Sequence, residues 1–335
     1  MRQHGGGHVG PAAAGARAQP RSSAPTVALL PLLFDAHCHL QLPHANLGSA
    51  DELVARARRA GVGGAAVCST SGRDWALVAA LKARHPEFVR AQYGVHPWWL
   101  DHDDAREPFG WSAELRAVLA RDPTAGVGET GLDKTRRSRA SLAAQRLVCA
   151  EHLRIARDLR RPVTLHCVRA YGSLLELIGD FARYECDASR PLPTCVLHGF
   201  RGPADLVARF AALGCRFSFG GHPLDDAHLQ LLRAVPRNRL LLETDAPDQL
   251  PPARVLALCG TAAGTGVDLP AADVVGAPSD DAGFANEPAN LRAIVRFVAA
   301  ELGWDAAELA RDASANARAV FCAQAAAHCA NAGDL

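Results

Sequence analysis

The stretch LLFDAHCH, residues 32–39, is a short apolar run in which Asp35, His37 and His39 occupy alternate positions. Alternate residues of a strand share one face, so the two imidazoles are expected to lie side by side. Continuous apolar runs of this length are typical of parallel strands that are buried on both faces. The stretch therefore predicts a buried strand that ends in two histidines.

Seven more runs of this kind follow, and amphipathic stretches with helical spacing separate them. They span residues 65–70, 88–97, 124–132, 163–167, 194–200, 216–221 and 240–245. Repeated strand-helix alternation indicates a (β/α)8 barrel, because each parallel strand needs a covering helix and a right-handed crossover. A doubly wound open sheet is the alternative, but its G-x-G-x-x-G fingerprint does not follow the first strand. We therefore predict an α/β protein with a TIM-barrel fold.

Composition limits the classes of partner and compartment. The chain has 335 residues, 49% of them hydrophobic, and 36 basic residues against 35 acidic ones. This balance leaves no broad basic field, so any contact with nucleic acid must be local. Ten cysteines are scattered without a CxxC pair, which is typical of reduced thiols. We predict a cytoplasmic protein, with a nuclear or organellar location as alternatives.

The expected organisation is one barrel between two tails. Residues 1–30 are rich in Gly, Ala, Pro and Arg and predict a disordered tail, with an organelle transit peptide as the alternative. The barrel is expected over 31–325, with a loop insertion at 251–284 after the eighth strand, and 326–335 form a second tail. The apolar stretch at 27–34 is far shorter than the roughly 20 residues that cross a bilayer, so we expect no membrane partner.

Ligand-type residues recur where the predicted strands end, which is where barrel enzymes place their active sites. A single strand histidine is more often a hydrogen-bonded core residue than a metal ligand. Two adjacent imidazoles on one face, however, are satisfied together by one cation. Six such residues at the same end of five strands therefore favour a metal site. They are His37, His39, Glu129, His166, His198 and Asp245.

Four neighbouring residues each keep two interpretations. His96 either lines the pocket or packs against the tryptophans that follow it in GVHPWW. Glu243 lies two positions before Asp245, on the same strand face, and serves either a further ion or the support of a ligand. Arg169 and Arg201 closely follow two of the candidate ligands, and are either contacts for an anionic substrate or ordinary exposed arginines.

At these residues the chain resembles the TatD family of metal-dependent deoxyribonucleases, within the amidohydrolase-like barrels. The resemblance covers nearly everything from Phe34 to Phe321. The motifs that carry it are DAHCHL, GVHPWW, GETGLD, VTLHC, VLHGF, ETDAP, NEPANLRAIV and SANARAVF. The sequences GVHPWW, RPVTLHCVRAYGSLLELI and FSFGG are most similar to a eukaryotic branch of this family, which is named for interaction with a subunit of the anaphase-promoting complex.

The resemblance implies two divalent metal ions, Mg²⁺, Mn²⁺ or Zn²⁺, with Glu129 as the bridge between them. It implies that the ligands are His37, His39, Glu129, His166, His198 and Asp245. Glu129 and Asp245 would also be catalytic, Asp245 by orienting the attacking water or accepting its proton. The implied activity is that of an exonuclease cleaving phosphodiester bonds. Near-neutral charge favours single-stranded DNA ends as substrate.

Two departures from the family pattern border the expected cleft and bear on substrate preference. HGFRG, residues 198–202, stands where the family usually has His-Cys-Phe-Ser-Gly, and Lys134 stands where it usually has an aromatic residue. One alternative function is hydrolysis of a small ester, amide or lactone. Many barrels of that kind bridge their metals with a carbamylated lysine, but neither Lys82 nor Lys134 ends a strand. Another alternative is an interaction protein with a protein partner, in which catalysis has faded.

Overall fold

Eight parallel strands form a single sheet whose order follows the chain. The computed structural model describes residues 32–42, 44, 46–100, 109–135, 139–221, 225–258 and 285–323. The strands are β1 (Leu33–Cys38), β2 (Val62–Cys68), β3 (Val89–Tyr93), β4 (Gly126–Asp133), β5 (Val163–Val168), β6 (Cys195–Leu197), β7 (Arg216–Phe219) and β8 (Leu240–Leu242).

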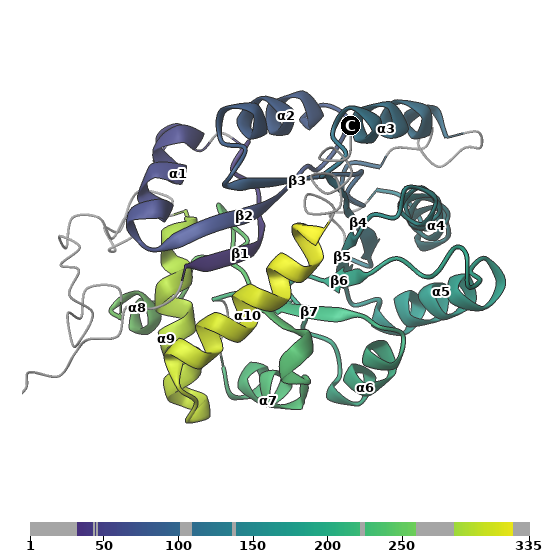
Figure 1. Ribbon diagram of the computed structural model, residues 1–335. Helices are drawn as coiled ribbons and strands as arrows, with labels where there is room; N and C mark the ends of the chain where they lie inside the picture. Colours follow the sequence, from purple (N-terminus) through teal and green to yellow (C-terminus); the bar gives the residue numbers. More distant parts are fainter. Residues whose placement is uncertain are drawn as a thin grey trace, which may run out of the picture.

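Helices follow the strands and lie around the outside of the sheet (Figure 1). The α-helices of the described residues are α1 (Ala50–Arg59), α2 (Trp75–Arg84), α3 (Gly110–Arg121), α4 (Leu142–Leu159), α5 (Tyr171–Tyr184), α6 (Ala204–Ala212), α7 (Asp226–Ala234), α8 (Ala253–Leu256), α9 (Leu291–Leu302) and α10 (Ala306–Phe321). Short 3₁₀ turns are η1 (Arg237–Arg239) and η3 (Pro288–Asn290).

The sheet curls into a nearly closed barrel, with the first and last strands meeting just beyond their ends. The Asp245 N–H donates to the His37 carbonyl at 2.9 Å, and the His39 N–H donates to the Ala246 carbonyl at 2.7 Å. These bonds join the end of β1 to the segment that follows β8. The prediction of an α/β protein with a (β/α)8 TIM-barrel fold is confirmed.

Helix α10 covers the N-terminal end of the barrel, opposite to the C-terminal ends of the strands. Phe321 stacks on Phe34 of β1, with ring centroids 5.9 Å apart. Both belong to a buried apolar cluster that also includes Val196 of β6 and Leu241 of β8. Figure 1 shows α10 lying across this opening. The apolar plug leaves the opposite end, where the strands terminate, for polar residues.

Several predicted boundaries differ from the structure. Strand β8 ends at Leu242, so the polar residues 243–245 follow the strand and do not belong to it. The short helix α8 lies within the stretch predicted as a loop insertion, because residues 253–256 form one turn after a proline. The rest of that prediction at 259–284, and the tails predicted at 1–30 and 326–335, fall outside the described residues. None of the described helices is both long and apolar enough to cross a bilayer.

Candidate metal centre

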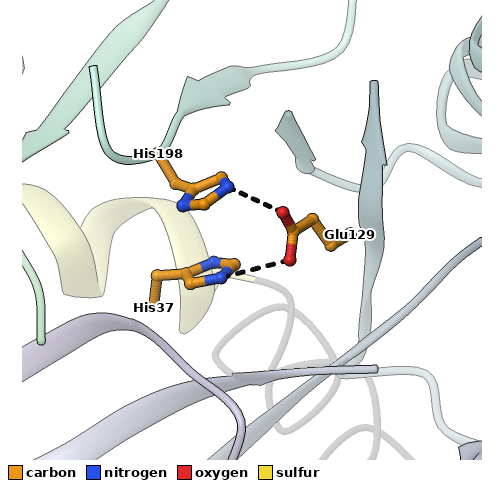
Figure 2. Close-up of side chains that lie close together, drawn as sticks. All are labelled: His37, Glu129 and His198. Carbon is orange, nitrogen blue, oxygen red and sulfur yellow. Dashed lines mark ion pairs between the residues drawn. The ribbon is translucent and has the colours of Figure 1, made fainter. Parts of the chain in front are cut away.

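The carboxylate of Glu129 lies at the centre of a group of imidazoles at the C-terminal end of the barrel. Its Oε1 is 2.7 Å from Nε2 of His198 and 3.0 Å from Nδ1 of His166. Its Oε2 is 3.3 Å from Nε2 of both His37 and His39. Figure 2 shows the carboxylate facing His37 and His198, one with each oxygen. The two oxygens of one buried carboxylate therefore serve two pairs of histidines from three other strands or strand ends.

Asp245 completes the side of the centre that faces β1. Its Oδ1 lies 3.4 Å from Nε2 of His37 and 3.6 Å from Nε2 of His39. The residue has a φ of 57°, a left-handed conformation that is uncommon for residues other than glycine. The structure thus brings together all six residues that the sequence predicts as ligands. Their roles as ligands stay a prediction.

His96, which follows β3, combines both of its proposed roles. Its Nε2 lies 3.3 Å from Oε1 of Glu129, so the imidazole faces the centre. Its ring also packs edge-on against Trp98, with centroids 4.9 Å apart. Trp98 itself is turned inward, whereas the neighbouring Trp99 is 54% exposed. The GVHPWW motif therefore supplies one residue to the centre, one to its support and one to the surface.

Asp133 was not among the predicted site residues. It lies at the end of β4, and its Oδ2 is 3.0 Å from Nε2 of His166 and accepts from Trp98 Nε1 at 2.5 Å. The sequence does carry a signal for it, because residues 129, 131 and 133 alternate along one strand face. The contact fixes the His166 ring so that its other nitrogen, Nδ1, faces Glu129.

Glu243 supports the loop that carries His198. It accepts from the Gly199 N–H at 2.7 Å and from the Ser218 hydroxyl, and it lies 3.8 Å from Nδ1 of His198. Of its two proposed roles, these contacts favour the support of a ligand. These contacts hold the backbone next to His198 and orient its ring.

Burial and charge oppose one another throughout the centre. Burial favours the neutral form of Glu129, but the facing histidines, His198 first, hold the pKa of its carboxyl well below its usual range. Burial also disfavours protonation of His39, yet the contacts with Glu129 raise its pKa to about 9. For His96 burial wins, and the pKa falls to about 4. The centre therefore combines an ionised carboxylate with imidazoles of mixed charge.

The donor set fits divalent cations. Nε2 of His37 and Nε2 of His39 lie only 3.1 Å apart and point at the same two carboxylates. The ligand atoms form three overlapping groups, and within each group the atoms lie within 4.8 Å of one another. They are His37, Glu129 and His198; His37, His39 and Asp245; and His96, Glu129 and His166. Imidazole and carboxylate donors together suit Zn²⁺ and Mn²⁺, and carboxylate oxygens also suit Mg²⁺.

A cavity of about 1090 Å³ opens above the centre. Glu129 and Asp245 lie among its walls, together with the exposed Trp99. Arg169 and Arg201 line it too. Apart from histidines, they are the positively charged residues among the described residues of its lining. The cavity is larger than most sites for small molecules, which measure roughly 300–1,000 Å³.

This fold and this centre define the class of a metal-dependent hydrolase built on a (β/α)8 barrel. The family model for TatD related DNase matches residues 34–322. The chain belongs to the TatD family, and the resemblance of its motifs is thereby confirmed.

Similar proteins come from bacteria and eukaryotes. A relative from Edwardsiella piscicida, named 3'-5' ssDNA/RNA exonuclease TatD, is 35% identical over 61% of this chain and 75% of its own length. The uncharacterized metal-dependent hydrolase YjjV of Escherichia coli is 33% identical over 64% of this chain and 79% of its own. A solved structure of the Escherichia coli TatD homologue YJJV covers 86% of this chain and 97% of its own, with 27% identity and a TM-score of 0.65. An uncharacterized amidohydrolase from Saccharomyces cerevisiae covers 87% of this chain and 100% of its own at a TM-score of 0.70, and its 21% identity shows the shared fold alone.

Proposed function

We propose that this protein is an exonuclease that hydrolyses phosphodiester bonds at the ends of single-stranded DNA and requires divalent metal ions. The observation that carries the proposal is the Glu129 carboxylate, whose two oxygens face His198 and His37 at the wall of a cavity that Asp245 also lines. Curated relatives in the same family are named 3'-5' ssDNA/RNA exonuclease, which supports nucleic acid as the substrate class.

The geometry suggests how the ligands divide between two ions. His37, His39 and Asp245 would hold one ion together with Oε2 of Glu129, and His166 and His198 would hold the other with Oε1. When bound, such a pair of divalent ions makes a shared water more acidic and neutralises charge on the phosphate. Glu129 suits the bridging position because its carboxyl stays ionised although it is only 1% exposed.

The residues of the chain have separate tasks in this scheme. Asp245 faces the cavity and is the candidate that orients the attacking water and accepts its proton. Asp133 and Glu243 hold the rings of His166 and His198, so that the nitrogens facing Glu129 stay in position. The cavity walls then orient the phosphate in line with the attacking oxygen.

A cleavage assay tests the proposal. Purified protein is incubated with single-stranded DNA labelled at either the 5' or the 3' end, in the presence of Mg²⁺, Mn²⁺ or Zn²⁺. We expect stepwise shortening from one end, and loss of this activity in Glu129→Gln, which keeps the size of the side chain but removes its charge. Glu176→Gln is the matched control, because Glu176 lies on the surface of α5 with its side chain 71% exposed.

Two other outcomes would overturn the proposal. Intact DNA with every metal, together with hydrolysis of an ester or lactone panel, would identify a small-molecule hydrolase. A folded protein that turns over neither class of substrate would favour the interaction protein. Circular dichroism of Glu129→Gln shows whether the substituted protein still folds, so that loss of activity is not confused with loss of structure.

A further inference from the structure

We propose that Arg201 forms a second phosphate-binding subsite, which takes the phosphate next to the one that is cleaved. This inference rests on the proposed function, because it assumes a nucleic acid strand in the cavity. It adds a residue that distinguishes a strand with several phosphates from a small diester with one. By its resemblance to the TatD pattern, HGFRG carries Arg201 at the position where that pattern usually has serine.

The backbone around Arg201 is fixed at three consecutive positions. The N–H of Gly199 donates to Oε1 of Glu243 at 2.7 Å, and the N–H of Phe200 donates to the Ser218 carbonyl at 3.0 Å. The N–H of Arg201 itself donates to the Tyr171 hydroxyl at 3.1 Å. The loop after β6 therefore holds the start of this side chain in place, which lowers the entropy lost when it binds a ligand.

The side chain is oriented toward the metal centre by Gln249. Nη2 of Arg201 donates to Oε1 of Gln249 at 2.5 Å, and Nε2 of the same amide donates to Oδ2 of Asp245. One glutamine thus connects the guanidinium to the carboxylate whose other oxygen faces His37 and His39. Arg201 lies one amide group away from a candidate ligand and lines the same cavity.

The chemistry of the guanidinium matches a phosphate. It is planar, remains charged, and can contact two phosphate oxygens at once. The metal ions would neutralise the phosphate that is cleaved. The Arg201 guanidinium beside them would therefore bind the adjacent phosphate of the strand. Because overall charge is close to neutral, one local cation of this kind has a large effect on binding.

The test compares the binding of two trinucleotides that resist hydrolysis. In the first, both linkages are phosphorothioates and carry a charge; in the second, one linkage is a neutral methylphosphonate, and both positional isomers are used. Binding is measured by fluorescence anisotropy with Mn²⁺ present. We expect the wild type to bind the doubly charged strand roughly tenfold more tightly than one isomer, and Arg201→Ala to reduce this ratio to about one. The ratio for the other isomer, which is neutral at the phosphate that the metal ions would hold, should be the same in both proteins.

Arg201→Lys is expected to keep part of the ratio, since it retains the charge but loses the planar fork. Arg190→Ala is the matched control, because Arg190 pairs with Asp187 on the surface after α5. It should leave the ratio at the wild-type value. Equal binding of all strands by the wild type, or an unchanged ratio in Arg201→Ala, would overturn the subsite.

The same experiment keeps the subsite separate from the proposed function. Cleavage of an unmodified trinucleotide tests the nuclease activity and is measured in parallel. If the wild type cleaves this strand but Arg201→Ala keeps the charge ratio, the nuclease stands and the subsite is wrong. If the strand is never cleaved yet the charge ratio depends on Arg201, the nuclease proposal fails while phosphate binding by Arg201 is supported.

Discussion

The carboxylate of Asp133 lies 3.0 Å from Nε2 of His166, the nitrogen on the opposite side of the ring from the one that faces Glu129. A carboxylate in this position keeps the proton on Nε2, so that Nδ1 presents its lone pair to the centre. Trp98 donates to the same oxygen of Asp133 and so restricts the carboxylate in turn. Residues of β4 and of the segment after β3 thus determine which nitrogen of the His166 imidazole on β5 carries the proton.

We therefore expect Asp133→Asn to weaken metal binding about 10- to 100-fold while the protein stays folded. The amide keeps the size of the side chain but removes the charge that holds the proton on His166. Titration calorimetry with Mn²⁺ measures the affinity directly and needs no substrate. Asp180→Asn is the control, because Asp180 lies exposed on α5. Equal affinities of Asp133→Asn and the wild type would show that the carboxylate does not set the state of the ring.

Much of the barrel could be predicted from the sequence because buried parallel strands consist of short runs of apolar residues. The run that contains Val163 and Leu165, for example, begins at the predicted residue and is buried along its length. The polar residues at the strand ends were recognisable for the same reason. His37 and His39 break an otherwise apolar pattern, and a buried polar group requires a partner.

Other parts of the site depend on contacts that no local pattern encodes. Asp133 shares a strand face with Glu129, which places it near the site, but its contact with His166 is seen only in the folded barrel. Gln249 lies in an irregular segment with a φ of 54°, beyond the end of β8. Its contacts with Asp245 and Arg201 join residues from two different loops. Such contacts appear only when the barrel has brought the loops together.

Gln249→Met is expected to lower kcat about tenfold, because it removes the amide that donates to Oδ2 of Asp245. Methionine has a similar length but no N–H donor, so the carboxylate becomes free to rotate away from the histidines. Steady-state kinetics on single-stranded DNA measure the effect, and thermal unfolding checks the fold. Gln230→Met on the exposed face of α7 is the control. A variant with wild-type kcat would show that Asp245 is held by its other contacts alone.

His152 of α4 predicts how stability depends on pH. Its ring is buried, with Nδ1 donating to the Val148 carbonyl at 2.8 Å and Nε2 accepting from the Val95 N–H at 3.1 Å. Burial lowers its pKa from 6.5 to about 4. Between these values the unfolded chain binds a proton that the folded protein does not, so this residue makes stability fall as the pH decreases.

Removing His152 should therefore flatten the acid side of the stability profile. We expect His152→Gln to be less stable than the wild type at pH 7.5, because the buried hydrogen bonds are altered. The difference in the free energy of unfolding between the wild type and the variant should narrow as the pH falls from about 6.5 toward 4. Complete protonation of this histidine would narrow it by on the order of 3 kcal/mol. Urea unfolding at pH 7.5, 6 and 5 measures the two profiles. Parallel profiles would mean that His152 contributes nothing to the acid sensitivity.

Metal removal provides a prediction about stability that needs no substrate. Ions that bind only the folded state stabilise it by about 2.7 kcal/mol when their concentration is 100 times the Kd. We expect Mn²⁺ or Zn²⁺ to raise the Tm by several degrees relative to protein treated with a chelator, and readdition of metal to restore it. The shift should be lost in Glu129→Gln, because the bridging charge is absent, and kept in Glu176→Gln. A Tm that does not change with millimolar metal, in a protein that remains folded, would contradict a metal centre around Glu129.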